Sequence, residues 1–228
     1  MLNIREWEHV FKLDPDKEID DHAIEQICES GTDAIMIGGT DNVTLEKVLN
    51  LMARVRRYTV PCVLEVSQVD AISPGFDMYF IPTVLNSPKR DWILGKHHLA
   101  IKEFGYMIDW KEMIVEGYCI LNENSKVAQL TEANCDLSEE DIEAYALMVE
   151  KMFHLPVFYI EYSGKYGDPK IVKQVKDVLE NTRLFYGGGI ETVEQAKEMK
   201  QYADCIIVGN VIYENLEEAL RTVKAVKE

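Results

Sequence analysis

The sequence predicts a closed (β/α)8 TIM barrel in a single domain covering residues 1–228, and three observations support this. The chain has 228 residues, a length typical of one such barrel. Eight short apolar segments alternate with helical patterns, which indicates a parallel sheet. Glycine-rich turns follow the last two apolar segments and a helical segment ends the chain, which favours closure over an open doubly wound sheet.

The expected strands are short segments rich in β-branched and aromatic residues and bounded by turn residues or helix caps. They span residues 9–14, 34–39, 62–66, 78–84, 116–121, 157–163, 184–190 and 205–212. Helices are expected where a Ser or Thr precedes an amphipathic stretch, because its hydroxyl can accept a hydrogen bond from the first helical turn. The caps and helices are Thr44 before 45–57, Ser138 before 139–152, Thr192 before 193–202, and a final helix over 216–227.

One unit of the barrel is irregular. Only residues 67–77 separate the third and fourth strands, and they include Ser73, Pro74 and Gly75. A helical crossover between parallel strands normally needs a dozen or more residues. We therefore expect a loop or extended segment in place of helix three, leaving a gap in the helical wall that could admit a long apolar ligand.

Composition limits the possible partners and the cellular location. The net charge of −16 disfavours nucleic acid, so any anionic ligand has to be bound by local geometry. The first ten residues contain no apolar signal core and no stretch is long enough to span a bilayer, so a cytoplasmic protein is expected. Five cysteines occur without a CxxC pair, and we expect reduced core residues rather than zinc ligands or nucleophiles. They are Cys28, Cys62, Cys119, Cys135 and Cys205.

The glycine turns predict a phosphate site. Gly188 and Gly189 lie at the end of the seventh predicted strand, and Gly209 and Asn210 lie at the end of the eighth. Glycines let backbone N–H groups approach an anion closely, and barrels commonly bind phosphate in these two loops. The alternative is that these glycines only turn the chain.

The sixth strand places a carboxylate inside the barrel. Successive side chains of a strand point to opposite faces, so Tyr159, Glu161 and Ser163 share the face expected inside the barrel. The other face, toward the helices, carries Phe158, Ile160 and Tyr162. Glu161 lies at the carboxyl end of the strand, where barrel active sites lie, and is therefore a candidate general base. A buried ion pair, with Lys12 as the partner, is the alternative.

The first two strands provide a candidate metal site. Lys12 and Asp14 alternate inward together, and Lys suits a phosphate while Asp suits Mg²⁺. Thr40 follows the second strand at the same rim and could add a hydroxyl ligand. Asp14 could instead form a turn before Pro15. Glu65 on the third strand is a candidate for a supporting position behind Lys12 and Asp14.

The motifs FKLDPD, IGGTDNVT, PGFDMYFIPTVLNS, EGYCI, FYIEYSG, LFYGGGI and IIVGN resemble those of the geranylgeranylglyceryl and heptaprenylglyceryl phosphate synthase family, of the PcrB type. The resemblance covers essentially the whole chain. It implies a homodimeric, Mg²⁺-dependent prenyltransferase that joins sn-glycerol 1-phosphate to a polyprenyl diphosphate through an ether bond at the C3 hydroxyl. Transient membrane contact on product release would be compatible with this activity.

The same resemblance implies roles for individual residues. Mg²⁺ would be coordinated by Asp14 and Thr40. Glycerol phosphate would be bound by Lys12, Tyr159, Ile160, Glu161, Tyr162, Ser163, Gly164, Gly188, Gly189, Gly209 and Asn210.

The prenyl chain is expected along an apolar stripe in residues 92–104. The stripe consists of Ile93, Ala100, Ile101 and Phe104. A small residue at the far end of the groove accompanies the heptaprenyl substrate in the family and a bulky one the geranylgeranyl substrate, and Ala100 matches the small one. The stripe could also be plain core. Other functions left open are a geranylgeranyl-specific enzyme, a phosphosugar isomerase or aldolase-type barrel, and a non-catalytic scaffold that binds a phosphometabolite.

Overall fold

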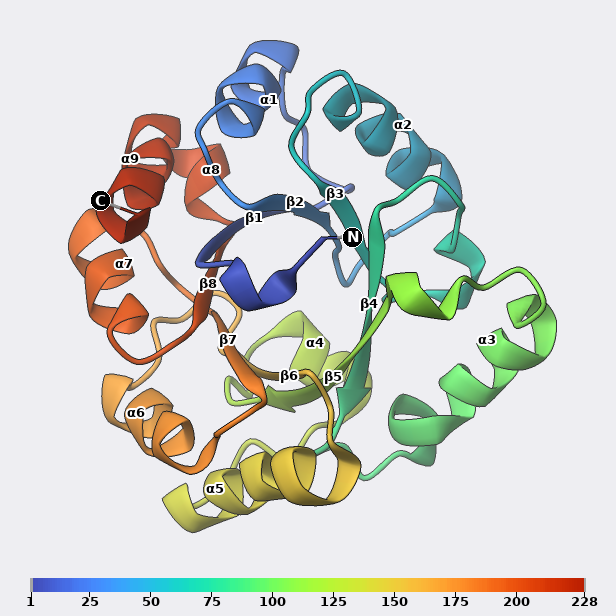
Figure 1. Ribbon diagram of the computed structural model, residues 1–228, viewed down its shortest axis with the longest axis vertical. Helices are drawn as coiled ribbons and strands as arrows, with labels where there is room; N and C mark the ends of the chain where they lie inside the picture. Colours follow the sequence, from blue (N-terminus) through green and yellow to red (C-terminus); the bar gives the residue numbers. More distant parts are fainter. Residues whose placement is uncertain (1, 228) are drawn as a thin grey trace.

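The computed structural model describes residues 2–227 and has a closed barrel of parallel strands (Figure 1). The strands follow one another around the barrel in chain order, and β8 pairs with β1 to close it. They are β1 His9–Leu13, β2 Ala34–Ile37, β3 Cys62–Glu65, β4 Met78–Val84, β5 Met113–Ile120, β6 Val157–Glu161, β7 Arg183–Gly187 and β8 Cys205–Val208. The predicted fold class is confirmed.

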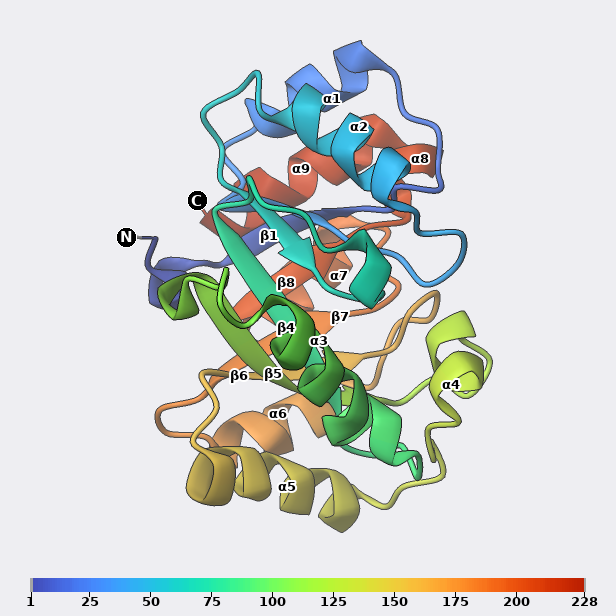
Figure 2. The same cartoon turned by 90° about the vertical axis from the view of Figure 1, so that its right-hand side faces the viewer.

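Helices surround the strands and form the outer layer, except α4, which lies at the carboxyl end of the barrel (Figures 1 and 2). They are α1 Asp21–Cys28, α2 Leu45–Val55, α3 Lys96–Phe104, α4 Lys126–Thr131, α5 Glu139–Leu147, α6 Pro169–Val178, α7 Val193–Lys200, α8 Val211–Glu214 and α9 Leu216–Lys227. A π-helical turn, η3 Asp91–Gly95, precedes α3, and another, η5 Met148–Phe153, follows α5. The predicted caps Thr44, Ser138 and Thr192 each accept a backbone hydrogen bond from the first turn, as expected.

Strand alternation divides the core into two layers. Along β6, Val157 and Tyr159 pack inside the barrel, while Phe158 and Ile160 pack against the helices. The amino-terminal end of the barrel is closed by Trp7, which is 4% exposed and stacks on Phe80 with the ring centroids 5.8 Å apart. The open end of the barrel is therefore the one where the strands terminate.

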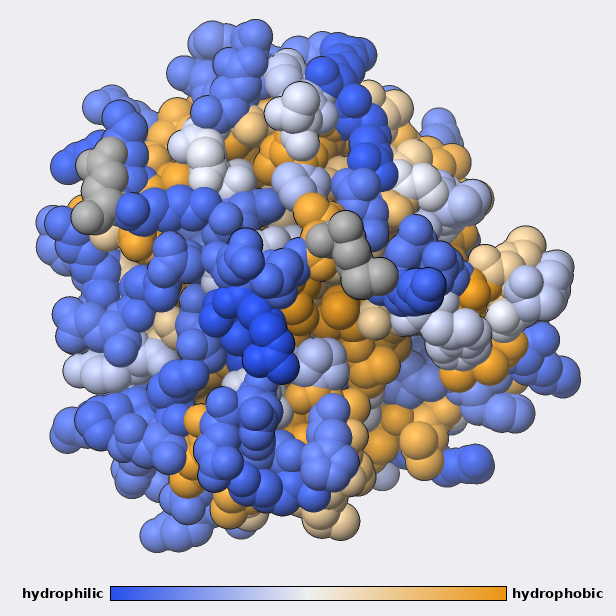
Figure 3. All heavy atoms as spheres, viewed as in Figure 1, coloured by the Kyte–Doolittle hydropathy of each residue, from blue (hydrophilic) through white to orange (hydrophobic). Residues whose placement is uncertain are grey.

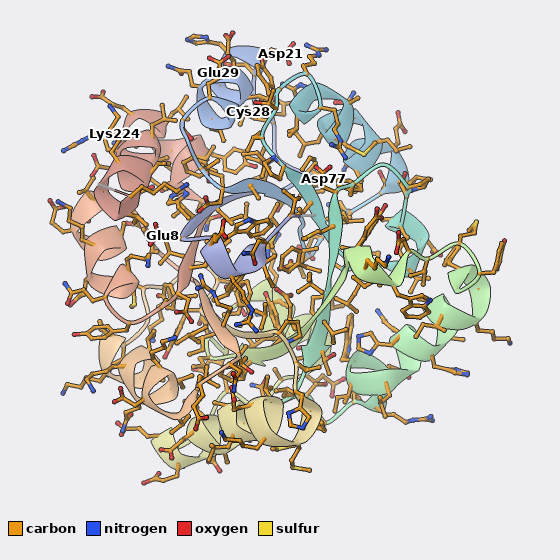
Figure 4. All side chains as sticks on the ribbon, in the orientation of Figure 1. Glu8, Asp21, Cys28, Glu29, Asp77 and Lys224 are labelled. Carbon is orange, nitrogen blue, oxygen red and sulfur yellow. The ribbon has the colours of Figure 1, made fainter. Side chains whose placement is uncertain are left out.

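The crossover from β3 to β4 contains no α-helix, as predicted. It consists of a loop with one short 3-10 turn, η2 Val69–Ala71. Asp77 fixes its end, because its carboxylate accepts a hydrogen bond from the N–H of Cys62 at 2.8 Å and pairs with Arg56 at 2.9 Å (Figure 4). Figure 2 views the barrel from the side of α3, where this loop replaces the helix expected in a regular barrel.

Several predicted strand bounds differ from the observed ones, and the last two strands overrun their observed ends the most. The eighth strand stops at Val208 rather than Ile212, because the chain turns at Gly209 and Asn210 into α8, which contains Ile212. The seventh stops at Gly187 rather than continuing to Ile190. Gly188 and Gly189 have φ angles of 151° and 53°, outside the extended region that a strand requires.

The cysteines match the prediction of reduced core residues. All five thiols are free, and Cys28, Cys62, Cys119 and Cys205 are buried while Cys135 is half-buried. Burial raises the pKa of Cys62 to about 12, which leaves that thiol uncharged near neutral pH. Among residues 2–227, no helix has both the length and the apolar character needed to cross a bilayer.

Candidate functional site

A continuous cavity of about 1660 Å³ lies at the carboxyl ends of the strands and extends to α3. Its polar end is lined by Lys12, Asp14 and Glu161 together with the glycine loops, and its other end by apolar residues of η3 and α3. Ligand pockets typically have volumes of about 300–1,000 Å³. The cavity therefore has room for a ligand much longer than a small phosphorylated metabolite.

The glycine loops present backbone N–H groups to the polar end of this cavity. Gly188, Gly189 and Gly209 line it, as does Asn210. In the described residues, the N–H groups of Gly188 and Gly189 have no hydrogen-bond partner. A Cβ atom at Gly189 would lie 2.2 Å from the backbone nitrogen of Tyr166, so a side chain is excluded there. The predicted phosphate loop thus has the backbone geometry that binding an anion requires.

Tyr186 fastens this loop to the neighbouring one. Its hydroxyl accepts a hydrogen bond from the N–H of Gly167 at 2.8 Å and donates one to the carbonyl oxygen of Gly188 at 2.8 Å. The loops that follow β6 and β7 are consequently held together before any ligand binds. Alternation along β7 gives no hint of this role, because Tyr186 packs in the outer layer of the core.

Glu161 projects into the cavity and is held at both carboxylate oxygens. Oε2 accepts a hydrogen bond from the hydroxyl of Tyr118 at 2.7 Å, and Oε1 accepts one from the N–H of Ser163 at 2.6 Å. The residue is 5% exposed. Burial raises the pKa of Glu161, although Lys12 and the Tyr118 hydrogen bond oppose the effect. A raised pKa makes a carboxylate a stronger base, which suits general-base catalysis.

The ion pair considered for Glu161 is formed by a different carboxylate. The ammonium group of Lys12 lies 2.6 Å from Oε2 of Glu65. Burial disfavours the charge of Lys12, but Glu65 and Glu161 outweigh that effect and raise its pKa, so the group stays protonated. Glu65 thus supports Lys12 from behind, and the Glu161 carboxylate does not depend on an ion pair.

A further buried carboxyl group, Glu116 on β5, lies deeper in the barrel. Burial and the charge of Glu65 raise the pKa of Glu116 well above its ordinary value, with Lys12 acting in the opposite direction. Neither of its oxygens has a hydrogen-bond partner among the described residues. These effects favour the uncharged form of Glu116, which avoids the cost of burying a third negative charge beside Lys12.

Asp14 is the acidic residue best placed to hold a cation. Its neighbours at the rim are paired, Asp16 with Lys47 at 2.5 Å and Asp41 with Lys126 at 2.5 Å. The carboxylate of Asp14 forms no ion pair within residues 2–227 and accepts only the N–H of Asp16, at 2.9 Å.

The backbone of the adjacent loop approaches this carboxylate closely. A Cβ atom at Gly39 would lie 2.6 Å from its Oδ1, so a side chain there would displace the Asp14 carboxylate. Thr40 follows on the same wall of the cavity. In the described chain, no cluster of three or more His, Cys, Asp or Glu side chains could hold a metal. Mg²⁺ commonly takes one or two protein carboxylates and completes its shell with substrate phosphate and water, and this donor set fits that pattern.

The remaining predicted residues divide between the cavity and the outer layer. Tyr159, Ser163 and Gly164 line the cavity. Ile160 and Tyr162 pack in the outer layer of the core instead and do not line the cavity, and the Tyr162 side chain lies against Gly167 and Gly188 of the neighbouring loops. The apolar stripe lies on the cavity wall, where Ile93, Ala100, Ile101 and Phe104 all line it.

Sequence reasoning missed two residues of the polar end. Tyr118 hydrogen-bonds Glu161, and the alternation of β5, which turns Glu116 and Tyr118 the same way, could have revealed it. Lys17 lies on the rim with its ammonium group 2.9 Å from Oδ1 of Asn210 and 4.7 Å above the Tyr213 ring. Nothing in the pattern of the sequence indicates that contact, because Lys17 follows the strand in a turn.

Comparison with known proteins agrees with this geometry. The model of the PcrB family matches residues 2–227. Heptaprenylglyceryl phosphate synthase from Geobacillus sp. (strain WCH70) is 60% identical over 228 residues and covers 100% of both chains. The protein of the same name from Bacillus cytotoxicus is 61% identical over 227 residues, 100% of this chain and 99% of the relative.

A solved structure is also similar over nearly the whole chain. It is (S)-3-O-geranylgeranylglyceryl phosphate synthase from Thermoplasma acidophilum in complex with its substrate sn-glycerol-1-phosphate. The two chains superpose with a TM-score of 0.86 at 25% identity, covering 97% of this chain and 93% of the other. With a family model and relatives that match from end to end, this chain belongs to the PcrB family.

Proposed function

We infer that this protein transfers a heptaprenyl group from heptaprenyl diphosphate to the C3 hydroxyl of sn-glycerol 1-phosphate, releasing diphosphate. The observation that supports this most directly is the single cavity that joins an anion-binding polar end to a long apolar end. A phosphosugar isomerase or a scaffold for a phosphometabolite would have no use for the apolar end. The names of the relatives point to the same reaction.

The polar end would bind glycerol phosphate. Its phosphate would accept hydrogen bonds from the N–H groups of Gly188, Gly189, Gly209 and Asn210, with the charge of Lys12 nearby. Glu161 lies on the same wall, so the substrate hydroxyl can approach its carboxylate while the phosphate stays in the loops. Holding the hydroxyl in one place lowers the entropic part of the barrier.

The chemical step forms one bond and breaks another at the first carbon of the prenyl chain. The C3 oxygen of glycerol phosphate bonds to that carbon, the carbon–oxygen bond to diphosphate breaks, and the hydroxyl proton passes to Glu161. Tyr118 and the Ser163 N–H hold the Glu161 carboxylate in position for this transfer. Because the surrounding wall is largely buried, the charges that develop are poorly screened by water and respond strongly to these fixed groups.

We propose that Asp14 and Thr40 hold Mg²⁺ beside the diphosphate. When bound, the ion would neutralise the charge of the leaving group. The protein contributes an unpaired carboxylate at Asp14 and leaves most of the coordination shell to the substrate and water. We further propose that the protein works as a homodimer in the cytoplasm.

The prenyl chain would lie along the apolar end of the cavity, past the loop that replaces a helix. Val69, Ile72 and Phe76 from this loop line one side, and Ala100 and Phe104 from α3 line the other. The small side chain of Ala100 leaves the passage open, which favours the heptaprenyl chain over the shorter geranylgeranyl chain.

The proposed reaction is tested by incubating the protein with labelled glycerol 1-phosphate and polyprenyl diphosphates of several lengths. Labelled ether lipid should form in the presence of Mg²⁺, and most rapidly with the heptaprenyl donor. Preferential use of the geranylgeranyl donor would identify the shorter-chain enzyme. Formation of no ether lipid with any donor would contradict the proposed function.

A further inference from the structure

The helical segment formed by η3 and α3 has no buried face. Neither η3 nor α3 contains a buried residue, and every residue from 88 to 112 is at least partly exposed. A helix that packed on the barrel in the usual way would bury one stripe of side chains. Figure 3 shows apolar side chains at the surface between the barrel and this helix.

The two sides of α3 differ in what they contact. Ala100 and Phe104 face the cavity, whereas Leu99 and Lys102 on α3 and Tyr106 just beyond its end do not line it. Leu99 is 49% exposed and Tyr106 84% exposed. The outer stripe thus combines apolar and cationic side chains, and nothing in the described residues covers it.

Apolar residues at the mouth of the cavity continue this surface. Leu94, Ile101, Met107 and Trp110 each line the cavity and are also exposed by 47% or more. The apolar end of the cavity therefore opens where the outer stripe of α3 lies. We call the exposed residues of this region the α3 surface, comprising Leu94, Leu99, Ile101, Lys102, Tyr106, Met107, Trp110 and Lys111.

Charge distinguishes this region from the rest of the protein. Residues 88–112 contain five Lys and Arg residues and four Asp and Glu residues, which gives this segment a net charge of +1. The whole chain has a net charge of −16. Lys102 and Lys111 form no ion pair within residues 2–227. A negatively charged membrane would repel most of the molecule, so approach through residues 88–112 has the smallest electrostatic cost.

We propose that the α3 surface docks on an anionic lipid bilayer. Exposed aromatic and aliphatic side chains beside cations are the composition of helices that lie in the membrane interface, where the apolar groups enter the acyl boundary and the cations contact lipid phosphates. In this orientation the mouth of the cavity faces the acyl chains. A lipid with a long apolar tail can then exchange between bilayer and cavity without passing through water. The docking rests on this surface alone and not on the proposed reaction.

Sedimentation of the full-length protein with vesicles tests the proposal. The protein should bind vesicles of phosphatidylcholine mixed with phosphatidylglycerol, bind phosphatidylcholine alone much less, and release as salt is raised. Lys102→Glu with Lys111→Glu should weaken binding to the mixed vesicles roughly tenfold or more, since each cation near such a surface contributes about fivefold. Leu99→Ser with Tyr106→Ser should weaken binding to the mixed vesicles as well. These four side chains do not line the cavity.

The matched control reverses the same amount of charge elsewhere. The control variant carries Arg221→Glu and Lys224→Glu. Both residues belong to α9, which lies on the opposite side of the barrel from α3 (Figure 4). This variant should bind vesicles within about twofold of the unaltered protein. Melting temperatures confirm that all variants are folded. The proposal would be overturned if the control and the α3 variants lost vesicle binding equally, or if the unaltered protein did not bind the mixed vesicles.

A protein partner at the same surface is the competing occupant, and sedimentation velocity distinguishes it. If the unaltered protein is a dimer and Leu99→Ser with Tyr106→Ser makes it a monomer, the α3 surface joins two copies and the membrane proposal is wrong.

Turnover is measured separately with detergent-dispersed prenyl diphosphate. Loss of docking with normal turnover in detergent supports the membrane role, and absence of turnover in the unaltered protein would count against the proposed reaction instead.

Discussion

At the scale of single residues, the site depends on keeping one carboxylate reactive among several. Glu65 pairs with Lys12, burial raises the pKa of Glu116 well above its ordinary value, and Glu161 is held by hydrogen bonds at the cavity wall. Each of these carboxyl groups is buried, but each is accommodated in a different way. The difference lies in their partners, and it makes Glu161 the group available to accept a proton.

We predict that Glu161→Gln lowers turnover by roughly 10²-fold or more and leaves glycerol phosphate binding and the melting temperature nearly unchanged. Gln keeps the shape of the side chain but is too weak a base to accept the proton. Glu65→Gln is the matched control, because it leaves Lys12 without its partner and should mainly lower the melting temperature. Near-normal turnover of Glu161→Gln together with a sharply reduced melting temperature would mean that Glu161 has a structural role.

A second prediction separates the two substrates. Asp14→Asn should reduce Mg²⁺-dependent turnover strongly and raise the Mg²⁺ concentration needed for half-maximal rate, while isothermal titration with glycerol phosphate shows little change. Asp16→Asn, at a carboxylate already paired with Lys47, should have a much smaller effect on turnover. Equal losses of turnover and glycerol phosphate binding in Asp14→Asn would contradict the assignment of Asp14 to the diphosphate end.

At the scale of elements, local patterns predicted most of the barrel. All eight strands and the caps at Thr44, Ser138 and Thr192 are where the sequence placed them, because alternation and capping are read from neighbouring residues. The strand ends at Gly187 and Val208 were missed, since an apolar residue such as Ile212 suits a strand and a short helix equally well.

The sequence placed Glu65 in a supporting position but did not identify it as the ion-pair partner of Lys12, for a different reason. Lys12 on β1 meets Glu65 on β3 across the inside of the barrel, and β2 lies between these strands. Which side chains meet there depends on the register of two successive strand pairs, and no local pattern specifies it. The alternation of β6 placed Glu161 inside the barrel correctly but could not identify Tyr118 as its hydrogen-bond donor.

The contact between η5 and the loop before β7 gives a prediction about pH. Glu150 on η5 accepts hydrogen bonds from the N–H groups of Asn181 and Thr182. Burial alone would raise the pKa of Glu150, but these hydrogen bonds outweigh it and lower the pKa to about 2. Because the folded-state pKa is depressed, the ionised group stabilises the protein above the unfolded-state value near 4.5, and this is lost as the pH falls toward 2.

We therefore predict that Glu150→Gln lowers the free energy of unfolding at pH 7 by roughly 2 kcal/mol. The difference between the variant and the unaltered protein should shrink as the pH is lowered from about 4.5, where the unfolded chain begins to take up the proton. Denaturant unfolding at a series of pH values measures this. Glu180→Gln, at an exposed carboxylate paired with Lys151, is the control and should change the free energy by less than about 1 kcal/mol. A difference that stays constant with pH would show that the Glu150 charge is not responsible.

At the scale of the whole molecule, one cavity runs from the glycine loops past the missing helix to α3. We predict that Ala100→Trp, which adds a bulky side chain to the apolar end, reduces turnover with heptaprenyl diphosphate at least tenfold. Turnover with geranylgeranyl diphosphate should be retained. Leu99→Trp, at the neighbouring position of the helix but outside the cavity, should leave both rates unchanged when substrates are dispersed in detergent. Equal loss with both donors in Ala100→Trp would mean that the chain does not extend along α3.

The loop between β3 and β4 has a consequence for how such a protein can evolve. By leaving the helical layer open on one side, it lets residues of the loop and of α3 line the apolar end of the cavity, and these are not the residues that hold Glu161 at the polar end. Substitutions in one region need not be matched by substitutions in the other. With the prenyl chain in its proposed place, a lineage can change the length of its lipid by substitutions at that end while Glu161 and its hydrogen-bond partners stay the same.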